Sequence, residues 1–230
     1  FLLTSIQKHS SIQQYSLLFD PSSKNNFVKK IQMKILHIIS SPRGKASFSI
    51  KLGNEIVAHL QSKYPGSVVR THDLTQTPFP HLEEVHLSSF LTETEKRTTE
   101  QAVAASHSDA AIAEIMEADI IVIGAPMYNF GIHSSLKAWL DHVLRAGVTF
   151  RYTEKGPEGL LINKKVYLAI SSGGIYSDGP MKSYDFTEPY LLKTLGFVGL
   201  NDITTYRVEG VAIPGIQETA FEKAVEKIAV

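Results

Sequence analysis

Short apolar segments alternate with segments of helical periodicity along most of this chain, and this alternation restricts the possible folds more than any other property. The run at 119–124, Asp-Ile-Ile-Val-Ile-Gly, is apolar at every interior position, as expected of a parallel strand buried on both faces. Further strands are expected at 34–40, 67–72, 165–171 and 203–208, and helices at 47–63, 93–117, 134–146, 187–196 and 218–229. This order predicts a doubly wound α/β sheet of five parallel strands with helices on both faces.

Local signals predict where some of these helices begin and end. Ser47 is a suitable N-cap for the first helix. Thr92 and Glu95 have the spacing of a capping box, which predicts that the second helix starts at Glu93. Gly147 follows the third helix as a C′ residue. The segment 74–91 contains Pro78 and Pro80 and is expected to be irregular.

The first 32 residues differ from the rest. They hold six serines and four lysines against one aspartate, a net charge of +3, whereas 33–230 carries −3. A secretory signal would need a basic start and a continuous apolar segment, and a transit peptide is usually rich in arginine, which is missing here. We therefore expect 1–32 to be an N-terminal extension outside the fold and 33–230 to be one domain.

Composition excludes several classes of function. The chain has 23 basic and 23 acidic residues, so it lacks the charge imbalance of proteins that bind nucleic acid or anionic membranes. It contains no cysteine, which excludes disulfide scaffolds, thiolate metal sites and a cysteine nucleophile. No apolar run approaches the ~20 residues of a membrane helix. We expect a cytoplasmic protein.

Three loops at the carboxyl ends of strands carry residues suited to a ligand. The loop at 40–49 brings serine hydroxyls to a helix N-terminus, where backbone amides and the helix dipole favour a phosphate. It does not have the P-loop pattern G-x-x-x-x-G-K-[ST]. An ordinary loop with a serine cap is the alternative interpretation.

The loop at 125–131 combines methionine, two aromatic residues and Asn129, which suits a planar heteroaromatic ring with a polar edge. A hydrophobic plug at the sheet end is the alternative. The loop at 170–176 contains Gly173 and Gly174, which permit either close approach of a ligand to the backbone or a tight turn.

Four segments, 126–130, 145–154, 156–160 and 172–174, closely resemble the FMN-dependent NADH:quinone oxidoreductase and NADH-azoreductase family. The resemblance runs from Met33 nearly to the C-terminus. It implies a flavodoxin-like fold, bound FMN, NADH as electron donor, quinone or azo acceptors, and a homodimer with the flavin near the subunit interface.

The resemblance also implies roles for particular residues. The FMN phosphate loop is matched by Ser41, Ser47, Phe48 and Ser49. The segment beside the isoalloxazine ring is matched by Met127, Tyr128, Asn129 and Phe130, and the pyrimidine side by Ser171, Ser172, Gly173 and Gly174. Aromatic positions around the substrate cleft are matched by Phe150, Tyr152, Tyr176 and Phe197.

The implied mechanism is ping-pong: NADH passes a hydride to the flavin and leaves, and an electron-poor acceptor takes its place. The cofactor carries this chemistry, so no protein group is predicted to act as acid or base. Backbone amides near Asn129 and Gly173 are expected to stabilise charge on the reduced ring.

Two other functions fit the same fold. A flavodoxin-type electron carrier would bind FMN without a substrate cleft, and a serine hydrolase would need Ser41 or Ser171 as nucleophile, although no G-x-S-x-G motif is present. Among the histidines, His37 is expected to be a satisfied core residue, and His133 and His142 are expected nearest the site. No histidine spacing is typical of a metal site.

Overall fold

The computed structural model describes residues 32–230, so the extension predicted at 1–32 lies outside the described residues except for Gln32. Five parallel strands form the sheet in the order β2-β1-β3-β7-β8. Their bounds are β1 Lys34–Ile39, β2 Val68–Asp73, β3 Ile120–Tyr128, β7 Lys165–Ser171 and β8 Asp202–Val208. The prediction of five parallel strands is confirmed. The strand order reverses between β1 and β3, where ligands bind in folds of this type.

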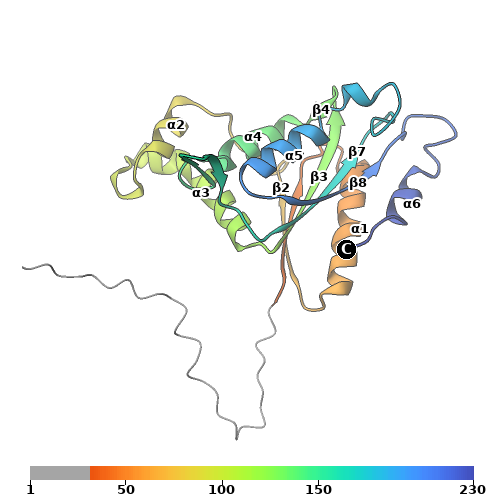
Figure 1. Ribbon diagram of the computed structural model, residues 1–230, viewed down its shortest axis with the longest axis horizontal. Helices are drawn as coiled ribbons and strands as arrows, with labels where there is room; N and C mark the ends of the chain where they lie inside the picture. The colour runs from red at the N-terminus through yellow and green to blue at the C-terminus, as the bar shows by residue number, and fades with distance from the viewer. Residues whose placement is uncertain (1–31) are drawn as a thin grey trace, which may run out of the picture. The chain divides into compact units, whose positions relative to one another are not determined.

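Helices cover both faces of the sheet, as predicted (Figure 1). One face packs against α1 (Phe48–Lys63) and α6 (Ala220–Val225), and the other against α3 (Thr99–Glu117), α4 (Ser134–Val143) and α5 (Glu188–Phe197). Successive residues of β3 alternate between these two cores: Ile120 and Val122 face α1, whereas Ile121 and Ile123 face α3 and α4. This burial on both faces explains why the strand is apolar throughout.

Three short strands and one helix were not predicted from the sequence. Strand β4 (Gly131–Ile132) pairs antiparallel with the end of β3, and β5 (Phe150–Thr153) pairs with β6 (Gly156–Gly159) in a separate hairpin. The prediction of an irregular segment at 74–91 is wrong for its second half, where α2 (Glu84–Leu91) forms. The Nδ1 atom of His86 accepts a hydrogen bond from the Glu83 backbone amide at 3.1 Å. Histidine is not the usual Glu or Gln at this position of a capping box, so the helix start carried no clear signal.

The predicted start of the next helix is also wrong. Helix α3 begins at Thr99, and its capping box consists of Thr98 and Gln101. Residues Thr94–Lys96 form a separate 3₁₀ turn, and the Thr92 hydroxyl instead donates to the Ser88 carbonyl at the end of α2. Thr92 and Thr98 both have the spacing of a capping box. Thr92 belongs to the end of α2, so Thr98 caps α3.

Helix α4 ends at Val143, three residues before the predicted end, and the Thr149 hydroxyl donates a hydrogen bond to the Val143 carbonyl at 2.7 Å. Helix α6 is likewise shorter than predicted. Trp139 is buried at 1% exposure in the core. None of the helices in the described part of the chain has the length and hydropathy needed to cross a bilayer.

Candidate functional site

A cavity of about 340 Å³ opens where the carboxyl ends of β1, β3 and β7 meet. Its walls come from the loops that follow these strands and from the segment after β8. The lining residues are Ser41, Arg43, Ser47, Phe48, Pro126, Met127, Tyr128, Ser171, Ser172, Gly173, Val211 and Ala212. The cavity lies at the reversal of strand order, the position expected for a ligand site in a doubly wound sheet.

A second cavity of about 240 Å³ adjoins the first, since both are lined by Met127 and Gly173. Its other lining residues are Asn129, Phe130, Gly174 and Tyr176. The first cavity has serine hydroxyl groups and the Arg43 guanidinium beside the rings of Phe48 and Tyr128, and the second is bounded by the rings of Phe130 and Tyr176 without a charged side chain. Together they offer an elongated site with one polar and one aromatic end.

The polar end is built on the N-terminus of α1. Ser47 is the N-cap residue, but its hydroxyl makes no hydrogen bond to the first-turn amides and instead pairs with the Ser49 hydroxyl at 3.0 Å. The first turn of α1 contains no acidic residue, and Arg43 is the charged side chain in the lining. The helix dipole, the serine hydroxyls and the guanidinium all favour an anion such as a phosphate here.

The aromatic end is a strained turn between β3 and β4. Asn129 and Phe130 are its central residues, and both have positive φ, 48° and 68°. Asparagine tolerates this left-handed region, but a bulky residue such as phenylalanine rarely adopts it. The Phe130 carbonyl accepts a hydrogen bond from the Phe186 amide at 3.0 Å, and the Phe130 ring lies 5.3 Å from that of Tyr184. These contacts hold the conformation and aim the Phe130 ring toward the second cavity.

The loop between β7 and α5 is anchored by charged groups from β8 and the residue that follows it. Glu209 accepts hydrogen bonds from the backbone amides of Tyr176 and Ser177 at 2.8 and 2.9 Å. Arg207 binds both Asp185 and Glu188. Burial by itself lowers the pKa of Arg207, but the hydrogen bonds that its guanidinium donates to the two carboxylates raise the pKa above the usual value. The guanidinium therefore stays charged and fixes the loop that carries Tyr176.

The segment after β8 is a wall of the site that the sequence analysis missed. Its backbone follows the loop after β7: the Gly210 amide donates to the Gly174 carbonyl, and the Ala212 amide to the Gly173 carbonyl, both at 3.0 Å. This brings Val211 and Ala212 to the first cavity. The rule that sites lie at carboxyl ends of strands, applied to this last strand as well, would have found them.

Most of the residues predicted to bind the cofactor come together at this edge. The first cavity is lined by Ser41, Ser47, Phe48, Met127, Tyr128, Ser171, Ser172 and Gly173, and the second adds Asn129, Phe130 and Gly174. Ser49 lines neither cavity and lies buried behind Ser47. Their roles in binding remain predictions.

The four predicted substrate residues separate into two groups. Tyr176 lies at the second cavity, 6.2 Å from the ring of Phe130. Phe150, Tyr152 and Phe197 form a different cluster at the β5–β6 hairpin and the end of α5, with the Phe150 and Phe197 rings 4.7 Å apart. Tyr152 is 73% exposed there. A single chain therefore does not bring this cluster to either cavity.

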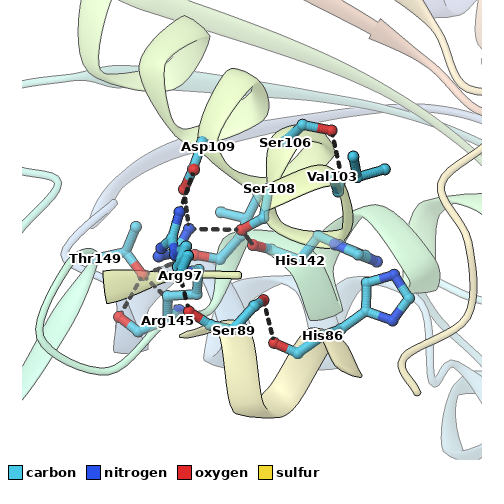
Figure 2. A network of polar contacts seen from close by, with 11 residues as sticks. His86, Ser89, Arg97, Val103, Ser106, Ser108, Asp109, His142, Arg145 and Thr149 are labelled. Atoms are coloured by element: carbon cyan, nitrogen blue, oxygen red, sulfur yellow. Dashed lines mark hydrogen bonds and ion pairs between the residues drawn. The ribbon is translucent and has the colours of Figure 1, made fainter. Parts of the chain in front are cut away.

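Two predictions about histidines need correction. His142 is fully buried away from the cavities, where its Nε2 atom donates to the Pro80 carbonyl at 3.0 Å. Its backbone carbonyl accepts a hydrogen bond from the Ser108 hydroxyl (Figure 2). His37 is buried in the core as predicted, but its Nε2 atom has no hydrogen-bond partner. Burial lowers its pKa to about 4. His133 does lie at the site, with its ring 5.4 Å from that of Tyr128. No group of three metal-ligating side chains occurs between residues 32 and 230.

The fold and this site together define a flavodoxin-like α/β protein with a place for a phosphorylated aromatic ligand. A family model described as flavodoxin-like fold matches residues 33–230. An FMN-dependent NADH:quinone oxidoreductase of Herminiimonas arsenicoxydans is 50% identical over 180 residues, which cover 78% of this chain and 88% of that protein. FMN-dependent NADH:quinone oxidoreductase 6 of Burkholderia lata is 48% identical over 196 residues, covering 85% and 98%. The chain belongs to the family of FMN-dependent NADH:quinone oxidoreductases.

Solved structures agree with this membership. An azoreductase of Bacillus anthracis superposes with a TM-score of 0.80 at 28% identity, covering 85% of this chain and 96% of that one. An FMN-dependent NADH-azoreductase of Bacillus anthracis in complex with FMN gives a TM-score of 0.74 at 25% identity, covering 84% and 96%. The predicted family, fold class and enzyme class are confirmed, and the serine hydrolase alternative is set aside.

Proposed function

We propose that this enzyme binds FMN in the two adjoining cavities and passes two electrons from NADH to quinones and aromatic azo compounds. The observation that carries the proposal is the shape and chemistry of this site: an anion-binding end at α1 continues, past Met127 and Gly173, into an end bounded by aromatic rings. The names of the relatives and of the structural neighbours support both the cofactor and the acceptors.

The residues present fit FMN. The phosphate would lie against the hydroxyls of Ser41 and Ser47, the first-turn amides of α1 and Arg43. The ring would lie along the backbone of Gly173 and Gly174. A Cβ atom added to Gly174 would come within 3.1 Å of the Tyr176 ring, so glycine keeps this loop close to its neighbours and leaves its amides accessible to a ring edge.

FMN, when bound, supplies the hydride acceptor and the two-electron donor of the reaction. The chain binds and orients it. Met127 and the turn at Asn129 and Phe130 offer flat, polarisable surface, and backbone amides near Asn129 and Gly173 would stabilise negative charge on the bound ring. Both substrates would use the one aromatic cavity in turn, which is the physical basis for ping-pong kinetics.

We also propose that the enzyme is a homodimer in which the cluster of Phe150, Tyr152 and Phe197 covers the flavin site of the other subunit. The exposure of Tyr152 on the hairpin supports this, because a large aromatic side chain at 73% exposure is favourable when a partner buries it. The predicted cytoplasmic location stays a prediction.

Reconstitution with FMN tests the cofactor site. The purified protein should be yellow, lose its flavin absorbance with NADH and regain it with benzoquinone. Ser47→Asp places another favourable N-cap residue at the start of α1 but should weaken FMN binding by roughly tenfold or more, because its carboxylate repels the phosphate. Ser106→Ala, on an exposed part of α3, is the matched control. A colourless protein that cannot be reconstituted would overturn the proposal.

Steady-state kinetics test the mechanism and the acceptors. Ping-pong turnover predicts parallel double-reciprocal lines for NADH with benzoquinone and with an aromatic azo dye, whereas intersecting lines would contradict it.

Mixed dimers test the site between subunits. Ser47→Asp and Tyr152→Ala chains, each weakly active, should regain activity when denatured together and refolded, since one intact site then forms. No gain over the separate variants would contradict the shared site.

A further inference from the structure

His133 occupies an unusual position at the start of α4. It is the N-cap residue, and its Nδ1 atom accepts a hydrogen bond from the Ser135 backbone amide at 3.2 Å. The usual N-cap residues are Ser, Thr, Asp and Asn. Because a backbone amide can only donate, Nδ1 carries no proton, and the neutral ring holds its proton on Nε2. The Ser135 hydroxyl lies 2.8 Å from the same Nδ1 atom.

The imidazole also contacts a residue of the proposed flavin site. Its ring stands at 64° to the ring of Tyr128, with the centroids 5.4 Å apart. Tyr128 lines the first cavity. The Ser135 hydroxyl lies 3.4 Å from the carbonyl of Ser40, where the phosphate loop begins. The side chain of His133 thus joins the cap of α4 to the aromatic wall of the cavity.

We infer that neutral His133 is a positioning residue that holds Tyr128 in place against the bound cofactor. This inference rests on the proposed FMN site. The edge-to-face contact restricts the tyrosine ring, and the cap restricts the imidazole, so the cofactor meets a wall that is already ordered.

Protonation would remove the cap, which is the restraint that fixes the imidazole beside Tyr128. An imidazolium carries a proton on Nδ1, which would oppose the Ser135 amide, and a positive charge at a helix N-terminus is unfavourable. Lys137, one turn along α4, forms an ion pair with Asp141, and Arg43 is the charged side chain in the lining of the first cavity. Tyr128 is the titratable group of β3 that faces the ring. Burial lowers the pKa of His133 below its usual value, so the neutral form predominates at neutral pH.

Three variants separate the cap from the ring contact. His133→Asn keeps a capping oxygen without the ring, His133→Phe keeps a ring without the cap, and His133→Ala has neither. FMN dissociation constants come from quenching of flavin fluorescence by the apoprotein, and circular dichroism confirms that each variant is folded. At neutral pH, His133→Asn should bind FMN about 2- to 10-fold more weakly, the equivalent of one aromatic pair.

Two readouts distinguish positioning from a purely structural role. As pH falls from about 8 to about 5.5, the affinity of the wild type for FMN should weaken more than the affinity of His133→Asn. The FMN phosphate titrates at pH ~6 in both experiments, whereas only the wild type loses its cap when the imidazole is protonated. In the Tyr128→Leu background, His133→Asn should have no further effect on FMN affinity. If the wild type binds FMN, identical pH profiles of wild type and His133→Asn, together with additive effects of the His133 and Tyr128 substitutions, would overturn the inference. Absence of wild-type FMN binding would instead overturn the proposed function and the inference with it.

Discussion

Asp109 of α3 forms an ion pair with Arg145, which lies just beyond α4 and is only 6% exposed (Figure 2). The other carboxylate oxygen of Asp109 accepts from Arg97 at 2.8 Å. The Arg145 guanidinium also stacks over the ring of Phe90 in α2, 4.7 Å from its centroid. One carboxylate therefore joins the segments around α2, α3 and α4. Burial by itself raises the pKa of Asp109, but the hydrogen bonds from Arg145 and Arg97 lower it below its usual value.

Replacing Asp109 should reveal the cost of a buried, unpaired guanidinium. Asp109→Asn is expected to lower the free energy of unfolding by about 1–3 kcal/mol, less than for a fully buried pair because Asp109 is half exposed. Urea denaturation followed by circular dichroism measures the change. Glu93→Gln is the control, since its ion pair with Lys96 is exposed and should contribute less than about 1 kcal/mol. Equal effects of the two substitutions would contradict the prediction.

Burial of His37 should make the protein less stable in acid. Its pKa is about 4 in the folded protein against 6.5 for an unperturbed histidine. The unfolded chain therefore binds more protons between these values, and stability falls as pH drops from 6.5 to about 4. The loss attributable to His37 is at most about 3 kcal/mol. Urea unfolding across this pH range should show a flatter dependence for His37→Val. Parallel curves for the two proteins would count against this assignment.

The ring of Phe130 should contribute to acceptor binding despite the strain of its backbone. Phe130→Gly relieves a left-handed conformation that costs a bulky residue of order 1–3 kcal/mol, which offsets part of the lost ring contacts. The KM for benzoquinone is expected to rise about tenfold as the aromatic surface is lost. Phe130→Tyr keeps the ring and should leave the KM nearly unchanged. A glycine variant with wild-type KM would show that the ring does not touch the acceptor.

Gly159 should be essential for docking the β5–β6 hairpin. A Cβ atom there would lie 2.1 Å from the Gly199 amide nitrogen and 2.3 Å from the Val198 carbonyl carbon. Both are backbone atoms that cannot rotate away. Gly159→Ala is therefore expected to destabilise the protein by about 2 kcal/mol or more, measured by thermal unfolding. Gly131→Ala meets no atom within 4 Å and should be tolerated; a similar loss in both variants would contradict this account.

The sequence alone determined the architecture, because its signals are local. Apolar runs predicted all five parallel strands, and the bounds of β7, Lys165–Ser171, are those predicted. Ser47 occupies the predicted N-cap position of α1, although its hydroxyl makes no capping hydrogen bond. The carboxyl ends of parallel strands meet at one edge of a sheet, which predicts a site at the loops after β1, β3 and β7. The cavities lie at these loops.

Tertiary structure decided what depends on residues far apart in the chain. Arg145 is buried because Asp109, 36 positions away, partners it, and no local pattern encodes that pairing. The wall formed by Val211 follows from backbone pairing between the loops after β7 and β8. Secondary structure and the edge that holds the site follow from periodicity, whereas the shape of the site follows from long-range packing and hydrogen bonds.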